Sequence, residues 1–147
     1  MSADPAPEAV LAMGRAVLAA QPFSVLLGAR LHALTLSPSA VELHLPLTEK
    51  LNQQHGFAHG GVVSYMADNA LTYAGGVAMQ CPVVTSEFKI NYLRPALGDM
   101  LIARAHAVHT GQSQAVCRCD LLAVKDGVEK LCAVAQGTIV RLPAPQT

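Results

Sequence analysis

Hydrophobic and polar residues alternate with a period of two in several segments of the chain, as in β-strands that bury one face. The clearest case is "AVELHLPL" at residues 40–47, where every second residue from Val41 to Leu47 is apolar. The alternation predicts six strands, at residues 29–36, 40–47, 83–93, 101–110, 114–124 and 130–142. Residues that favour turns separate them, namely Ser-Pro-Ser at 37–39 and a glycine in each of the last three connections.

Two further segments are predicted to be helices. Residues 7–21 are rich in Ala, Leu and Met, and Pro22 is expected to end that helix, while residues 1–7 are expected to include a disordered tip. Residues 59–80 form a longer stretch that is apolar on nearly all sides. Its length would suit a membrane span, but Asp68 near its middle would cost about 2.5–3.5 kcal/mol there. A buried helix of a globular domain is therefore the better interpretation.

The order of these elements predicts an α+β fold. Short connections between strands favour antiparallel pairing. One long helix beside about six strands suggests a sheet that curls around the helix, which explains why the helix is apolar all round. We expect residues 1–27 to form an N-terminal tip and helix, and residues 28–147 to form a single domain.

The composition indicates that much of the surface is buried. The chain has 147 residues, one domain by length, of which 52% are hydrophobic and 14% charged, so some apolar surface is expected between subunits. Ten basic and ten acidic residues cancel, and no basic cluster suggests nucleic acid. The N-terminal "MSADPAPEAV" lacks the basic and apolar regions of a signal peptide. A cytoplasmic protein is expected.

The cysteines do not form a recognisable site. They are Cys81, Cys117, Cys119 and Cys132. No Cys-x-x-Cys pair is present and no histidine lies at zinc-finger spacing, so no metal is expected. Cys117 and Cys119 are two residues apart in a predicted strand and share a face. We interpret all four as small apolar residues of a protein in a reducing cytosol.

The long helix carries one polar stripe. With 100° per residue, Asp68 shares a face with small or polar residues, which are Gly61, Ser64, Tyr65, Thr72 and Gly75. The opposite side carries apolar residues such as Met66 and Val77. A stripe of this kind lines either a polar cleft or a close helix–helix contact, and a buried Asp is often only a structural acceptor.

The start of the same helix favours the cleft. His59-Gly60-Gly61 occupies the first turn, where backbone N–H groups lack partners and carry partial positive charge. Two residues without Cβ atoms let an oxygen of another molecule approach these donors, as in an oxyanion site. Asp68 follows on the same face, two turns and roughly 10 Å further along. A carbonyl group could be polarised at the glycines while Asp68, or a water that it holds, reaches the carbon.

These residues resemble a known family. The pattern Gln-x-x-Gly-x-x-His-Gly-Gly with an Asp nine residues after the His is formed by Gln53, Gly56, His59, Gly60, Gly61 and Asp68. Together with "VVTSEFKINYLRPALGD" at Val83 to Asp99, it is similar to the hotdog-fold acyl-CoA thioesterases of the phenylacetate-degradation type. The resemblance covers roughly residues 28–142 and agrees with the predicted order of elements.

The resemblance implies a role for individual residues. Asp68 would be the general base or nucleophile, the Gly60 amide would polarise the thioester carbonyl, and His59 would shape the turn. Thr85 would lie near the attacking water and come from the partner chain. Substrate contacts would come from Gln53, Gly61, Tyr65, Asn91 and Arg94, with Gln53 replacing a common Asn and Arg94 near the coenzyme A phosphates. The acyl pocket would be shaped by side chains such as Tyr65, Met66, Tyr73, Phe88 and Leu93 of two subunits.

The resemblance also implies an assembly, in which two chains join their sheets, two such dimers form a tetramer, and each site lies between subunits. Dimer or tetramer stays open, as does the acyl chain. No cofactor is expected, because coenzyme A belongs to the substrate. Hydratase chemistry is not favoured, because no acid precedes His55 or His59 at the required spacing. Two other classes remain as alternatives, a non-catalytic acyl-CoA-binding protein and a purely structural oligomeric domain.

Overall fold

The computed structural model describes residues 5–145. Its helices are α1 (Pro7–Ala19), α2 (Pro22–Leu27) and α3 (Gly60–Met79), with a short 3-10 helix, η1, at Glu49–Leu51. Its strands are β1 (Arg30–Thr35), β2 (Ala40–Pro46), β3 (Val83–Tyr92), β4 (Met100–Thr110), β5 (Gln114–Lys125) and β6 (Val128–Arg141). All six predicted strands and both predicted helices are present.

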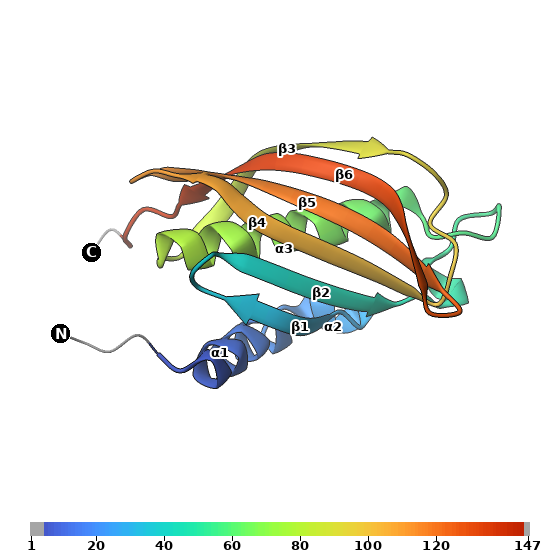
Figure 1. The fold of residues 1–147 in the computed structure, drawn as a ribbon, viewed down its shortest axis with the longest axis horizontal. Helices are drawn as coiled ribbons and strands as arrows, with labels where there is room; N and C mark the ends of the chain where they lie inside the picture. Colours follow the sequence, from blue (N-terminus) through green and yellow to red (C-terminus); the bar gives the residue numbers. More distant parts are fainter. Residues whose placement is uncertain (1–4, 146–147) are drawn as a thin grey trace.

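The six strands form one antiparallel sheet in the order β1-β2-β4-β5-β6-β3. The sheet curves around α3, and α1 and α2 lie next to β1 at one side of the molecule (Figure 1). The predicted α+β class, with an antiparallel sheet wrapped around one long helix, is confirmed. This is the hotdog arrangement that the resemblance implies. No helix within residues 5–145 is both long and apolar enough to cross a membrane.

The chain beside Pro22 contains one element that the sequence pattern did not indicate. The first helix ends at Ala19, before the proline as expected, but Pro22 also begins the short helix α2. Proline suits the first position of a helix because its fixed φ is helical and its missing N–H needs no partner there. Gly28, at φ 85°, then ends α2 in the left-handed conformation. Of the predicted tip, residues 1–4 lie outside the described residues, and Pro7 already belongs to α1.

The N-terminal helix packs on the same core as the rest of the chain. Val10, Gly14 and Leu18, at spacing four, form its buried face. The absence of a side chain at Gly14 lets the helix approach β1 closely, since a Cβ there would lie 2.6 Å from Leu31 Cδ2. The hydroxyl of Tyr73 on α3 donates to the Gly14 carbonyl at 2.8 Å. These contacts fix α1 relative to α3.

Register shifts interrupt four of the strand pairings, and those in β1 and β3 change which residues of interest face the helix. In β1 the pairing with β2 shifts between Leu31 and Ala33, and in β3 the pairing with β6 shifts between Thr85 and Glu87. An extra residue on one strand moves the following side chains to the opposite face of the sheet. Both bulges affect polar residues of interest, His32 and Thr85.

Candidate active site

The carboxylate of Asp68 lies half-buried on the side of α3 that faces the start of β3. Its Oδ1 atom accepts a hydrogen bond of 2.6 Å from the Thr85 hydroxyl. No partner is recorded for Oδ2 within residues 5–145, and that atom is not buried. No cation pairs with Asp68 among these residues. One oxygen is therefore held in place while the other is open to a ligand or a water.

The Thr85 hydroxyl is itself supported by Thr72, one turn after Asp68 on α3. The two threonine hydroxyls lie 2.7 Å apart, and Thr72 Oγ1 also lies 2.7 Å from the backbone carbonyl of Asp68. Each hydroxyl has one hydrogen. Because Thr85 uses its hydrogen for Asp68, Thr72 divides its own between the Asp68 carbonyl and Thr85 Oγ1. The result is a directed chain of hydroxyls that ends on the carboxylate.

The bulge in β3 explains why Thr85 can take this role. Simple alternation predicts that Thr85 faces away from Phe88, Ile90 and Tyr92. Ser86 is the extra residue of the bulge, so Thr85 and Phe88 face the helix together. The expected alternation of this strand is wrong at that point. The hydroxyl that contacts Asp68 belongs to the same chain. That a threonine of the partner chain lies near the attacking water, as the resemblance implies, stays a prediction.

The first turn of α3 offers one free backbone donor. His59 is the N-cap residue, and its Nδ1 atom accepts the Gly61 N–H at 2.8 Å. A Cβ at Gly61 would lie 3.0 Å from that nitrogen, so glycine keeps the cap undistorted. The N–H of Gly60 has no recorded partner among the described residues. Of the two glycines, Gly60 is thus the one whose amide is available, while the Gly61 amide is used by His59.

Tyr92, which the sequence analysis did not single out, covers this helix terminus. Its hydroxyl lies 3.1 Å from the Gly60 carbonyl oxygen and also contacts Ser64 Oγ. The ring helps to line a pocket of about 460 Å³ at the start of α3, together with Gly60, Leu93 and Arg94. The sequence signal was present, because alternation puts Tyr92 on the same face of the strand as Phe88 and Ile90, but it did not indicate that this tyrosine reaches the start of α3.

Tyr65, predicted to contact substrate, is directed elsewhere. Its hydroxyl donates to Ser24 on α2 at 2.6 Å and accepts from Asn69 at 3.1 Å. Its ring meets that of Phe23 edge to face, with centroids 5.3 Å apart. Burial raises the pKa of Tyr65, and the Ser24 and Asn69 hydrogen bonds only partly oppose this. The residue fixes α2 against α3 and does not line the pocket at Gly60.

Two other predicted contacts also lie apart from the Gly60 pocket in this chain. The side-chain oxygen of Gln53 accepts the N–H of His55 and so stabilises its own loop. Asn91 is exposed and neighbours Tyr92 on β3, so it lies on the face of the strand that points away from the helix. Arg94, in contrast, is exposed and helps to line the pocket, and its contact with the coenzyme A phosphates stays a prediction.

The free Gly60 amide and the Asp68 carboxylate lie far apart in one chain. Eight residues of helix separate them, which corresponds to a rise of about 12 Å. A donor and a base that act on one carbonyl group must both lie about 3 Å from it. This rise exceeds the span of one carbonyl group, which favours a site that takes the two groups from different chains.

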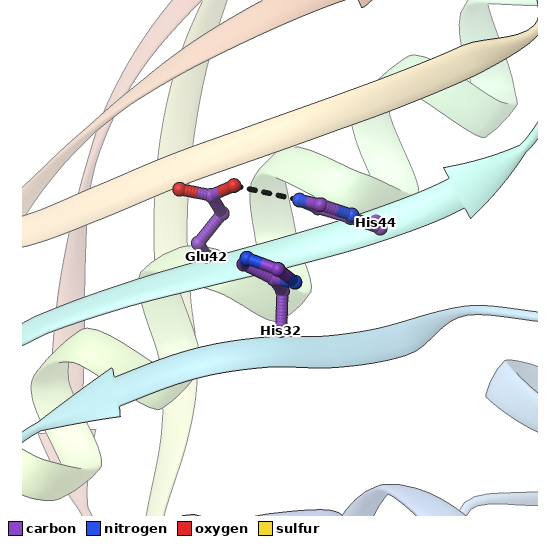
Figure 2. Close-up of side chains that lie close together, drawn as sticks. All are labelled: His32, Glu42 and His44. Atoms are coloured by element: carbon purple, nitrogen blue, oxygen red, sulfur yellow. Dashed lines mark hydrogen bonds and ion pairs between the residues drawn. The ribbon is translucent and has the colours of Figure 1, made fainter.

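One group of side chains offers metal ligands, although the sequence analysis found no such cluster. His32, Glu42 and His44 bring their ligand atoms within 4.8 Å of one another. Figure 2 shows Glu42 and His44 on β2, with His32 reaching over from β1. The bulge in β1 places His32 next to them, which residue spacing did not reveal. Glu42 is already engaged at both oxygens, by His44 at 2.6 Å and by Arg104 at 2.9 Å, so its carboxylate is occupied by neighbouring side chains in this structure.

The cysteines are unpaired in the structure, and Cys117, Cys119 and Cys132 are buried. Burial raises the pKa of all three thiols, to about 11 for Cys117. A thiol with a raised pKa remains protonated and unreactive at neutral pH. These residues therefore act as small apolar core side chains, as predicted.

Comparison with known proteins agrees with this architecture. A thioesterase family protein from Silicibacter pomeroyi is 39% identical, with a TM-score of 0.81, over 86% of this chain and 93% of that one. The phenylacetic acid degradation protein PaaI from Thermus thermophilus, solved as a mutant, is 31% identical, with a TM-score of 0.71, over 83% of this chain and all of that one.

A curated relative, 1,4-dihydroxy-2-naphthoyl-CoA hydrolase from Listeria monocytogenes, is 28% identical over 99 residues. The match covers 66% of this chain and 78% of the relative. Residues 55–130 match the family model described as "Thioesterase superfamily", a range that contains α3 with Asp68 and the free Gly60 amide. The chain is a member of the thioesterase superfamily.

Proposed function

We propose that the protein hydrolyses acyl-CoA thioesters, with Asp68 as the group that acts on the carbonyl carbon. The observation that carries this proposal is the half-satisfied carboxylate, with Oδ1 fixed by Thr85 and Oδ2 open. Asp68 either takes a proton from the attacking water or attacks directly. The carbonyl oxygen becomes an oxyanion, which a Gly60 N–H stabilises. The carbon–sulfur bond then breaks, and coenzyme A leaves as a thiolate. The water route gives the free acid at this point. After direct attack the acyl group is left as an anhydride on Asp68, which a water molecule then hydrolyses to the acid and the free carboxylate.

The rise of about 12 Å along α3 between Gly60 and Asp68 suggests that each site takes its amide and its carboxylate from different chains, as the family resemblance implies. Strand β3 is an edge of the sheet and offers its free side for pairing. Tyr92 contacts Gly60 near one end of β3, and Thr85 contacts Asp68 near the other. Antiparallel pairing of two β3 strands about an axis near Phe88 would bring these ends together. Gly60 of the partner subunit would then face Asp68.

The pocket beside Gly60 suits the coenzyme A arm. It is lined mainly by apolar groups, and Arg94 at its rim offers a positive charge for a phosphate. An extended pantetheine chain fits a volume of about 460 Å³, which lies within the range of small-molecule sites. The unpaired cysteines favour a reducing compartment, consistent with a cytoplasmic enzyme.

Two inactivating substitutions test the activity and the shared site in one experiment. Gly60→Pro removes the proposed donor yet suits the first turn of a helix, and the φ and ψ of His59, −61° and 139°, are those preferred before proline. Asp68→Asn removes the base. Each purified variant should lose thiol release from acyl-CoA esters. Gly60→Ala keeps the N–H but adds a Cβ beside it, so it should lose less activity than Gly60→Pro.

Co-expression of the two variants distinguishes the arrangements. If each site combines Gly60 of one chain with Asp68 of the other, mixed dimers contain one intact site, and a statistical mixture recovers about a quarter of wild-type activity. If one chain supplies both groups, no activity returns, which would contradict the shared site. Binding of acyl-CoA by the wild type without any thiol release would instead favour the non-catalytic alternative.

A further inference from the structure

A second cavity lies between α1 and α3, on the other side of Thr72 from the Gly60 pocket. Its volume is about 450 Å³. Most of its lining is apolar, with Met13 and Val17 from α1 and Tyr73, Val77 and Val83 from α3 and β3. The functional assignment above uses only the Gly60 pocket and the carboxylate, so it leaves this cavity without an occupant.

Some apolar residues of α1 are exposed beside the cavity. The face with Val10, Gly14 and Leu18 is buried against the sheet, but the neighbouring stripe with Met13 and Val17 is not. Met13 is 67% exposed and Val17 is 55% exposed. Because Gly14 and Tyr73 fix α1 in place, this stripe cannot close onto α3 without breaking the Gly14–Tyr73 hydrogen bond. The cavity is thus held open with an apolar wall.

The polar side chains at the cavity do not require a polar ligand. Asn69 donates to Tyr65 at 3.1 Å, and Gln21 accepts from Ser24 at 2.6 Å, so each already has a partner in the protein. Thr72 is the third polar residue of the lining. Its hydroxyl contacts Thr85, whose own hydroxyl holds Asp68. The polar end of the cavity therefore adjoins the carboxylate, and the rest of it is apolar.

We propose that this cavity binds the acyl group of the thioester and that Met13 and Val17 of α1 determine how long or wide that group can be. The inference rests on the proposed thioesterase function. When the carbonyl carbon lies at Asp68, the coenzyme A arm extends toward the pocket at Gly60 of the partner subunit. The acyl substituent then extends past Thr72 into the cavity beside α1. The volume and apolar lining suit a medium-chain or aryl-substituted acyl group and exclude a charged one.

A chain-length series tests this assignment. Rates of thiol release are measured for acetyl-, butanoyl-, hexanoyl-, octanoyl- and phenylacetyl-CoA, and kcat/KM is compared. Each methylene that enters the cavity should raise kcat/KM by up to about fourfold, as expected for its removal from water. In Val17→Trp the indole fills the cavity, so octanoyl-CoA should lose at least about tenfold while acetyl-CoA stays within about twofold.

Leu26→Trp is the matched control. Leu26 lies on α2, is 76% exposed and does not line the cavity, so its substitution adds the same side chain outside the proposed site. The control should keep the wild-type chain-length profile. Met13→Ala, which enlarges the cavity, should shift the preference toward longer chains.

The outcomes separate this inference from the proposed function. If the wild type hydrolyses the series and Val17→Trp lowers every rate equally or none at all, the acyl assignment is overturned and the thioesterase function is unaffected. A change of oligomeric state in Val17→Trp, measured by light scattering, would show that the cavity contacts another copy of the chain. That result would also overturn the acyl assignment. If no ester is hydrolysed, the function fails, and calorimetry then tests the cavity: octanoyl-CoA must bind the wild type more tightly than coenzyme A, and must lose that advantage in Val17→Trp.

Discussion

Asp68 and Glu42 are two partly buried carboxylates with opposite environments. Glu42, on the outer face of the sheet, is bonded at both oxygens, to His44 and to Arg104, and Arg104 is held in turn by both oxygens of Glu129 at 2.8 Å. Asp68, on the inner side, has no cation partner within residues 5–145, where a neutral hydroxyl holds one of its oxygens. A carboxylate with every acceptor occupied stabilises the fold, whereas one with a free oxygen can act on another molecule.

The titration of Glu42 reflects its environment. Burial alone would raise its pKa, but the hydrogen bonds and charges of Arg104 and His44 together outweigh burial and lower it below its ordinary value of 4.5. The carboxylate is thus committed to its charged, paired form. The comparison indicates that partner count, more than burial, separates the structural carboxylate of Glu42 from the carboxylate of Asp68, for which we propose a catalytic role.

The largest expected effect comes from exchanging each carboxyl for an amide. Asp68→Asn keeps the shape but removes the base, so kcat/KM should fall by at least about 10²-fold, the usual loss on removing a general base. Glu42→Gln should leave kcat/KM within about twofold, because its partners do not touch the site. The measurement is thiol release at saturating and limiting acyl-CoA. Equal activity of Asp68→Asn and wild type would remove the distinction between the two carboxylates.

A smaller effect is expected from the hydroxyl that holds Asp68. Thr85→Val keeps the shape of the side chain and removes the donor to Oδ1. A hydrogen bond to a charged group contributes about 1.5–3 kcal/mol, so kcat should fall by about tenfold or more. The change should appear in kcat with little change in KM, because the hydroxyl positions Asp68 and does not bind the substrate arm. Thr85→Ser restores the donor and should recover most of kcat, and failure of that rescue would indicate a packing role only.

The fold followed closely from the sequence because each strand and helix carries a regular period. The predicted strand at 40–47 and the helix at 59–80 end within one residue of β2 and α3. Alternation and helical periodicity reflect burial of one face, which is the main contribution to stability in both elements. The short helix α2 was missed because six residues are too few to show a period, and the proline that begins it is also the signal that ends α1.

The site was predicted only in part, since its arrangement depends on irregular backbone. The pairing of Asp68 with the glycines of the helix start follows from spacing, and the structure has both on α3. The contact of Thr85 with Asp68 depends on the bulge at Ser86, and the group of His32 with Glu42 depends on the bulge in β1. No period in the sequence indicates a bulge, because one inserted residue looks like ordinary strand. The direction of the Tyr65 hydroxyl toward α2 and the contact of Tyr92 with Gly60 depend on neighbouring elements that the sequence pattern did not place.

The smallest expected effect is that of Glu42 on the stability of the folded protein at different pH values. Because the pKa of Glu42 is lower in the folded protein than in the unfolded chain, its charged form contributes stability above about pH 4.5, and that contribution is lost as the pH falls through the folded-state pKa. Glu42→Gln should therefore lower the free energy of unfolding by about 0.5–1 kcal/mol at pH 7, the scale of a partly exposed ion pair. The difference from wild type should shrink toward zero near pH 3.

Urea unfolding of both proteins at pH 7, 5, 4 and 3 measures this difference. Gln136→Ala is the control, because Gln136 lies on the same face of the sheet and its side chain does not titrate. A difference that stays constant with pH would mean that Glu42 contributes through packing alone, and its contrast with Asp68 would then not be one of charge.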